Sequence, residues 1–420
     1  MFRGECGGGW RRREVPDLSD LSEGIPDVSR LGRWLVITFL ESLASTMIER
    51  GVFFYSQAYL GFTDGQNLGL AVSFGAAYVA GALSSRALAV RLKEKRLLWV
   101  SIVGQMLFYA ALFAQPGSWV LVVGNVLLGY VMGVKWPVIQ SYVCAGRTPA
   151  ATIPTIGRFN LAWITAWPVA LAVTGPLLAW WPRSLFAAAA MVSVGSLFLM
   201  RPMAGRPDHL PLDHPDRPAP GVMHRYRALL VSSRWSLVVS YMFLWVLSAL
   251  MPRIFADLNV GVGVSPALSG VLDGVRGLTF LALQIYPGWH NRVLPLVGVV
   301  MGLPAGFLMI LFGPNLATVL LGELVFGASA GMAYYAALYY AMVVKNAAVE
   351  AGGGHESLIG IGLVIGPLAA LLGGALGPAL GSPTLGMAVG VAPLVIVGAG
   401  GAVWSLLGLR RRTGPAESAD

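Results

Sequence analysis

Twelve apolar stretches, each near the length of a membrane-crossing helix, dominate this sequence. A helix needs about 20 mostly apolar residues to cross about 30 Å of hydrocarbon. The predicted spans are residues 34–60, 68–88, 97–114, 119–142, 157–179, 185–200, 235–256, 266–286, 293–312, 317–344, 357–380 and 384–409. Charged residues make up only 12 % of the chain, whereas about 25 % is usual in a soluble protein. The sequence therefore predicts a polytopic membrane protein and excludes an ordinary soluble enzyme.

The basic residues indicate how the chain sits in the membrane. Lys and Arg total 29 against 20 Asp and Glu. Most of them fall in segments that alternating spans leave on one side of the membrane. Such residues are retained in the cytoplasm, so we expect both termini there, in a bacterial cytoplasmic (inner) membrane. The basic excess is thus a topology signal and needs no nucleic-acid partner.

The spans divide into two groups of six, separated by the one long polar connection. We predict a cytoplasmic tail over 1–33, a six-helix bundle over 34–200, a cytoplasmic central loop over 201–234, a second bundle over 235–409 and a cytoplasmic tail over 410–420. The connections between spans are otherwise short, and they leave no room for a folded domain outside the membrane.

A glycine pattern recurs in corresponding spans of the two halves. Small residues every fourth position let neighbouring helices approach closely, and a Gly-Pro pair loosens the helix where it can bend. The matching residues are Gly124-Asn125, Gly129 and Gly133 against Gly322-Glu323, Gly327 and Gly331, and Gly175-Pro176 against Gly366-Pro367. Two matches in the same order predict that the halves are related six-helix bundles.

Twelve spans, termini inside, a long central loop and matching halves resemble the major facilitator superfamily of secondary transporters. The turn after the second span is similar to that family's signature loop, Gly-x-x-x-Asp-Arg: Gly81 and Arg86 match, whereas Ser85 replaces the aspartate. The resemblance implies an all-α fold of two pseudo-symmetric bundles. It also implies that the first, fourth, seventh and tenth spans line a central cavity.

Ionisable residues within spans are costly and usually face a bundle interior or a water-filled cavity. By the resemblance, the predicted substrate or proton pathway comprises Glu41, Glu49, Asn125, Lys135, Trp136, Glu323 and Tyr334. Predicted gating or helix-packing positions are Gly81, Arg86, Gly129, Gly133, Gly175, Pro176, Gly327, Gly331, Gly366 and Pro367.

Several of these side chains have a purely structural alternative. Glu41 and Lys135, at matched depths, can form a buried pair or a gate contact. Asp273 and Arg276 lie three residues apart on one helix face, which favours an internal ion pair. Glu356, at the predicted start of a span, is expected to stabilise the positive end of that helix.

The predicted function is secondary active transport of a small solute by alternating access, with protons as a candidate coupling ion carried by Glu49 or Glu323. Alternatives are a lipid or drug exporter, a membrane-embedded enzyme, or a non-transporting receptor or scaffold with the same fold. The sequence has no ATP-binding loop of the Walker type. It predicts no catalytic residues, no metal and no cofactor, and we expect a monomer whose partners are the solute, protons and the lipid bilayer.

Overall fold

The structure is a computed structural model that describes residues 28–144, 149–206, 220–345 and 349–412. Every regular element in these ranges is a helix. Within the described residues, eleven helical segments are long and apolar enough to cross a membrane, and the shorter apolar helix Ser184–Met200 occupies the remaining predicted position. The predicted all-α membrane fold is confirmed.

The helices follow the predicted spans closely. Those of the first half are α1 (Val28–Glu49), α2 (Gly51–Leu60), α3 (Asp64–Leu92), α4 (Glu94–Ala114), α5 (Ser118–Cys144), α6 (Pro149–Trp180) and α7 (Ser184–Met200). Those of the second half are α8 (Pro220–Asp257), α9 (Ser265–Ser269), α10 (Val271–Ile285), η1 (Pro287–Trp289), α11 (Leu294–Leu311), α12 (Leu316–Lys345), α13 (Val349–Gly374), α14 (Gly377–Leu380) and α15 (Pro383–Arg412).

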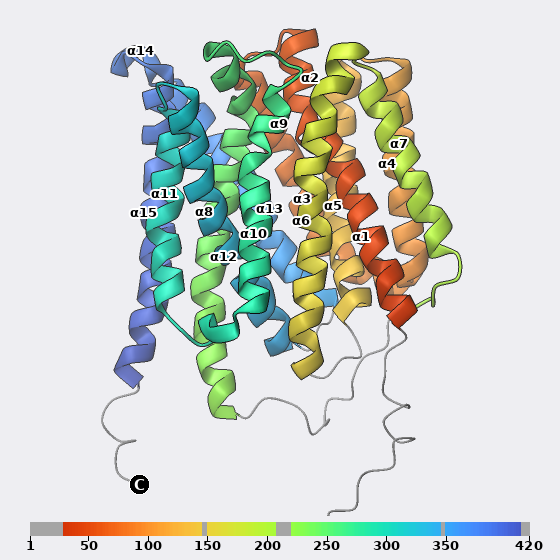
Figure 1. Ribbon diagram of the computed structural model, residues 1–420, viewed down its shortest axis with the longest axis vertical. Helices are drawn as coiled ribbons and strands as arrows, with labels where there is room; N and C mark the ends of the chain where they lie inside the picture. Colours follow the sequence, from red (N-terminus) through yellow and green to blue (C-terminus); the bar gives the residue numbers. More distant parts are fainter. Residues whose placement is uncertain (1–27, 145–148, 207–219, 346–348, 413–420) are drawn as a thin grey trace, which may run out of the picture.

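The long helices stand side by side and alternate in direction, so that α1 begins and α15 ends at the same, lower end of the molecule (Figure 1). The short helices α2, α9 and α14 lie at the opposite, upper end. Helices α1–α7 form one bundle and α8–α15 the other. The two bundles meet mainly where α3 packs against α13 and where α6 packs against α10.

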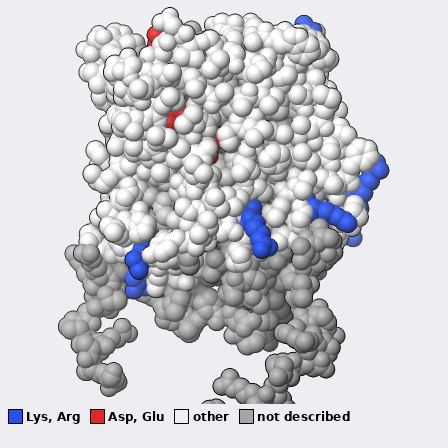
Figure 2. Space-filling model, viewed as in Figure 1, with Lys and Arg blue, Asp and Glu red and all other residues white. Residues whose placement is uncertain are grey.

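The outer surface of the spans is apolar. Leu107, Trp119 and Ile396 are 67 %, 81 % and 72 % exposed, a burial pattern that suits lipid rather than water. Figure 2 shows a broad band almost without charge, with most of the visible Lys and Arg side chains towards the lower end. The chain is therefore an integral membrane protein.

The repeated glycines lie at close helix contacts in both halves. A side chain on Gly129 would meet the backbone of Phe74, and one on Gly133 that of Tyr78, where α5 crosses α3. Gly327 and Gly331 stand in the same way against α10. Gly81 and Gly366 likewise face backbone atoms of neighbouring helices, and Gly175 faces the Gly263 carbonyl in the turn between α8 and α9. The repeat recognised in the sequence thus marks equivalent helix crossings.

Three helices, α6, α8 and α13, begin at least eight residues earlier than the apolar stretches indicate. Helix α8 starts at Pro220, within the predicted central loop, and α13 starts at Val349 rather than at 357. Hydropathy detects only the part of a helix that lies in hydrocarbon, whereas backbone hydrogen bonding continues into the polar flank. Ser232, for example, is fully buried in α8 and donates a hydrogen bond to the Ala402 carbonyl, 3.1 Å away.

Candidate functional site

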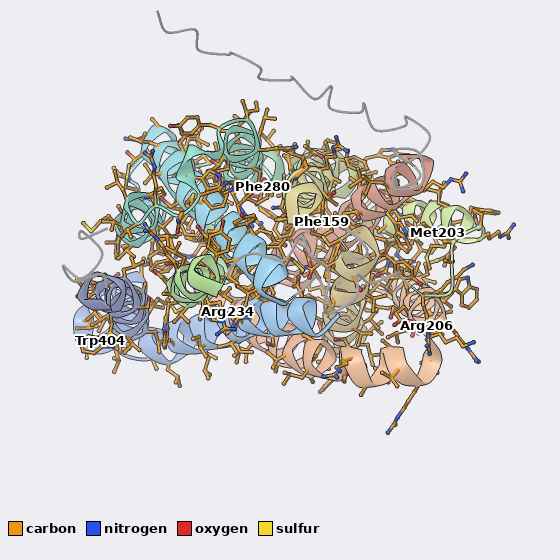
Figure 3. The ribbon with its side chains drawn as sticks, turned by 90° about the horizontal axis from the view of Figure 1, so that it is seen from below. Phe159, Met203, Arg206, Arg234, Phe280 and Trp404 are labelled. Atoms are coloured by element: carbon orange, nitrogen blue, oxygen red, sulfur yellow. The ribbon has the colours of Figure 1, made fainter. Side chains whose placement is uncertain are left out.

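A small cavity lies where the two bundles meet. The first bundle contributes Glu49 and the aromatic residues Phe74, Tyr78, Trp136, Phe159, Trp163 and Trp167, and the second contributes Tyr241, Trp245, Tyr334, Glu356, Ile359 and Leu363. Phe159 lies near the middle of the molecule when it is seen from below, between helices of the two halves (Figure 3). The cavity has a volume of about 50 Å³, which is room for only a few water molecules.

Three residues of the predicted pathway, Glu49, Trp136 and Tyr334, line this cavity. Glu49 is the last residue of α1 and is 6 % exposed. None of the described residues forms a hydrogen bond or an ion pair with it. It lies within the electrostatic reach of Lys135 and Arg50 on the positive side and of Asp273 and Glu356 on the negative side. Its carboxylate therefore has no ion-pair partner among the described residues.

Glu356 is the second carboxylate of the cavity, and sequence reasoning misplaced it. Because α13 begins at Val349, Glu356 lies about two turns inside the helix, not at its start. Tyr78 and Gln140, both from the first bundle, donate hydrogen bonds to it. The sequence does contain a signal for this position, because the residues around Glu356 are mostly apolar. An acidic residue within an apolar stretch rarely faces lipid.

Glu41 and Lys135 form the predicted buried ion pair. The Lys135 Nζ–Glu41 Oε2 distance is 2.8 Å, and both side chains are fully buried. Gln105 accepts a hydrogen bond from Lys135 at 2.8 Å, donates to Glu41 at 2.7 Å and donates to Ser193 at 3.0 Å. All of these groups belong to the first bundle, and the structure does not place Glu41 or Lys135 among the residues that line the cavity.

A second buried charge network joins the two bundles. Asp273 pairs with Arg276 of its own helix, as predicted, and with Arg50 at the break between α1 and α2, each at 3.1 Å. The Arg276 guanidinium also lies 5.2 Å and 5.3 Å from the ring centres of Trp163 and Trp167. Because Arg50 and Asp273 come from different bundles, this pair can persist only while the bundles are in contact.

Two other residues of the predicted pathway, Asn125 and Glu323, form hydrogen bonds to neighbouring helices. Asn125 donates hydrogen bonds to the Leu70 carbonyl at 2.8 Å and to Ser73 at 3.3 Å. Glu323 is fully buried and accepts a hydrogen bond from the Leu272 amide at 3.1 Å. The structure places neither at the cavity, because each points into a helix contact within its own bundle.

Contacts between the bundles close the cavity on both sides. Towards the upper end, Asp64 pairs with Arg253 at 2.6 Å. Towards the lower end, α13 packs tightly on α3, where a side chain on Gly353 would meet the Ala82 carbonyl at 3.1 Å. Gly157 similarly lies against the side chain of Gln284. A molecule outside could therefore reach the cavity only if one set of these contacts opened.

The described residues hold no cluster of metal ligands, and the neighbours Ser357 and His355 do not bond to each other. They contain no group of three or more His, Cys, Asp or Glu side chains that could hold a metal ion. Ser357 donates its hydroxyl hydrogen bond to the Gly354 carbonyl at 3.1 Å. Within the described part of the chain, neither ring nitrogen of His355 has a partner, so these neighbours make no Ser–His hydrogen bond.

Comparison with proteins of known structure identifies the fold. No protein-family model matches the sequence, and no curated protein matches it. A bacterial homologue of the human lysosomal transporter Spinster, inward-facing and occupied, has a TM-score of 0.65 and 15 % identity, covering 92 % of this chain and 98 % of that chain. A mutant of the nucleoside transporter NupG has a TM-score of 0.61 and 11 % identity, covering 91 % and 99 %.

The major facilitator superfamily transporter FucP, in its outward conformation, has a TM-score of 0.59 and 12 % identity, covering 90 % of this chain and 99 % of that chain. These likenesses extend along both bundles and include inward-facing and outward-facing conformations. The fold of this chain is that of the major facilitator superfamily of transporters.

Proposed function

We propose that the chain belongs to this superfamily and is a secondary active transporter that carries a small solute by alternating access. The observation that carries the proposal is the central cavity, which lies between two similar bundles and is closed on both sides by contacts between them. Rocking the bundles about a fixed central site would open one side while the other stays closed.

The proposed setting is a bacterial cytoplasmic membrane, with a monomeric protein and both termini inside. Its support is the distribution of charge: the visible basic side chains lie mostly towards the end at which α1 begins and α15 ends (Figure 2). Lys and Arg near helix ends are favoured on the cytoplasmic side.

Protons are the proposed coupling ion, with Glu49 as the proton carrier. Glu49 has no fixed counter-ion among the described residues, although Lys135, Arg50, Asp273 and Glu356 influence it electrostatically. A proton or a ligand can therefore neutralise its charge, and that change would bias the equilibrium between the two openings of the cavity. Glu323, the other predicted carrier, lies outside the cavity lining.

Distance measurements between spin labels test alternating access without a known substrate. Ala58 and Ala256 are exposed on different bundles at the upper end, and Arg158 and Ile285 are exposed on different bundles at the lower end. We expect labels at the upper pair and at the lower pair to show two distances each, with opposite changes in population. A single fixed distance for both pairs, across pH and in lipid nanodiscs, would instead favour a non-transporting receptor.

Coupling is tested with the first solute that reconstituted vesicles accumulate. Glu49→Gln should abolish accumulation driven by a pH gradient and retain counterflow at saturating solute, because counterflow does not need the proton step. Glu94→Gln, the same change at a residue outside the cavity, is the matched control and should retain both. Unchanged accumulation in Glu49→Gln would eliminate Glu49 as the carrier.

A further inference from the structure

The charges buried in the described helices do not balance. Three basic residues, Arg50, Lys135 and Arg276, accompany five acidic ones, Glu41, Glu49, Asp273, Glu323 and Glu356. Lys135 forms an ion pair with Glu41, and both arginines form ion pairs with Asp273. The remaining three carboxylates have no ion pair with a described residue. Two of them, Glu49 and Glu356, line the central cavity.

An unpaired buried carboxylate is unfavourable in a low-dielectric interior unless it is neutralised. Hydrogen bonds partly compensate Glu356, which accepts from Tyr78 and Gln140, and Glu323, which accepts from the Leu272 amide. Glu49 has no such compensation among the described residues. Among the residues that line the cavity, none is Lys, Arg or His. The described residues therefore supply no positive charge at this site, and either a proton or a bound cation from outside the protein would balance it.

The rest of the cavity wall is built mainly from aromatic rings. The face of an aromatic ring attracts a cation, and Trp attracts it best. The protein already uses this attraction at the same rings: Lys135 Nζ lies 5.4 Å from the ring centre of Trp136, and the Arg276 guanidinium lies 5.7 Å from that of Tyr241. Trp245 and Tyr334 also line the cavity and have no such contact with a described cation.

We propose that this cavity binds an organic cation, either a protonated amine or a quaternary ammonium ion, as the solute of the transporter. The charged nitrogen would lie between Glu49 and Glu356, one carboxylate from each bundle, and the apolar substituents would contact the surrounding rings. This assignment rests on the proposed transport function. Since the closed cavity holds only a few waters, entry of such a ligand requires the bundles to separate.

Phenyltrimethylammonium and tert-butylbenzene test the assignment, because the two molecules have nearly the same shape and differ in charge. Binding to the purified protein can be followed by quenching of tryptophan fluorescence, since four tryptophans line the cavity, and by thermal shift. We expect the cation to bind at least about tenfold more tightly than the neutral molecule. Phenethylamine and 2-phenylethanol provide a second matched pair for a protonated amine.

Variants locate the binding site. Glu49→Gln should weaken binding of the cation at least about tenfold and leave binding of the neutral molecule unchanged. This variant is expected to fold, since the Glu49 carboxylate bonds to no described residue. Glu94→Gln should bind the cation like the unmodified protein. At Trp136, replacement by Leu should weaken binding by about 2- to 30-fold, and replacement by Phe should recover part of it.

Equal affinity for the charged and neutral molecules, or no binding of either cation, would overturn the proposed solute class. Binding that Glu49→Gln does not alter would overturn the proposed site. These failures differ from failure of the transport proposal. If the spin-label distances report both openings but neither cation binds, the solute class is wrong and alternating access stands. If a cation binds while the labels report opening on one side only, the cation site stands and the protein is a receptor.

Discussion

The buried pair of Glu41 and Lys135 allows a stability prediction whose magnitude can be worked out from the structure. The charged atoms are 2.8 Å apart, and both side chains are fully buried. With an effective dielectric constant of about 20, their Coulomb attraction is about 6 kcal/mol. The cost of removing both charges from water offsets much of that attraction, so the net value of the pair is small.

Removing one partner has a larger effect than the net value of the pair, because it leaves the other charge buried and unpaired. Glu41→Gln and Lys135→Met should each lower the free energy of unfolding by about 3–5 kcal/mol. At about 2–4 °C per kcal/mol for a unit of 150–250 residues, the melting temperature should fall by roughly 6–20 °C. The double variant should be more stable than either single variant, because neither charge is then left alone.

The unmodified protein, the two single variants and the double variant form a double-mutant cycle. Their thermal unfolding in one detergent can be followed by near-ultraviolet circular dichroism. Glu323→Gln is the matched control: it makes the same change at another fully buried glutamate, which has no ion pair with a described residue. It should cost less than Glu41→Gln. If the losses of the two single variants simply add in the double variant, the pair does not stabilise the bundle as described.

Three further predictions concern packing, closure and topology. Gly133→Ala should cost about 1–3 kcal/mol through overpacking against α3, whereas Gly69→Ala, with open space around it, should leave the melting temperature unchanged or raise it. Asp64→Asn removes a partly exposed pair worth about 0.2–1 kcal/mol, so the spin-label population with an open upper side should rise by up to about fivefold. Gln115 and Arg206 are both exposed, so each can be replaced by cysteine in a background without native cysteines. An impermeant thiol reagent applied to intact cells should label the cysteine at position 115 but not the one at position 206. The reverse result would invert the topology.

The fold could be predicted because the membrane imposes simple rules on sequence. Apolar stretches of the right length must become helices, since every backbone polar group needs a partner in hydrocarbon. The glycine repeats that end at Gly133 and Gly331 indicated that the two halves are related, and the structure places both residues at close helix crossings. Helix ends were predicted less well, as α8 and α13 show, because a helix continues beyond the apolar stretch that reveals it.

The site could be predicted only in part, because a sequence shows which residues are charged but not which ones meet. Glu41 and Glu49 belong to the same predicted span and to the same predicted pathway. In the structure Glu41 turns into its own bundle, whereas Glu49 reaches the cavity just before the helix breaks at Arg50. Glu356 was missed because its helix begins earlier than expected, and Arg50–Asp273 was missed because its partners are far apart in the chain.

The buried ion pairs are of two kinds. Some lie within one bundle, and one joins the two bundles. Glu41–Lys135 and Asp273–Arg276 each lie within one bundle, so they can persist in every conformation. Arg50–Asp273 joins the two bundles, so under the proposed rocking motion it would break when the upper side opens. Asp273 would then still be paired with Arg276, whereas Arg50 would lose its carboxylate partner. Consecutive residues of a helix do not face each other, so Arg50 is not placed to pair with Glu49 when it is released. The bond that joins the bundles can therefore break without supplying a counter-ion to the cavity, and Glu49 still depends on a proton or a bound cation.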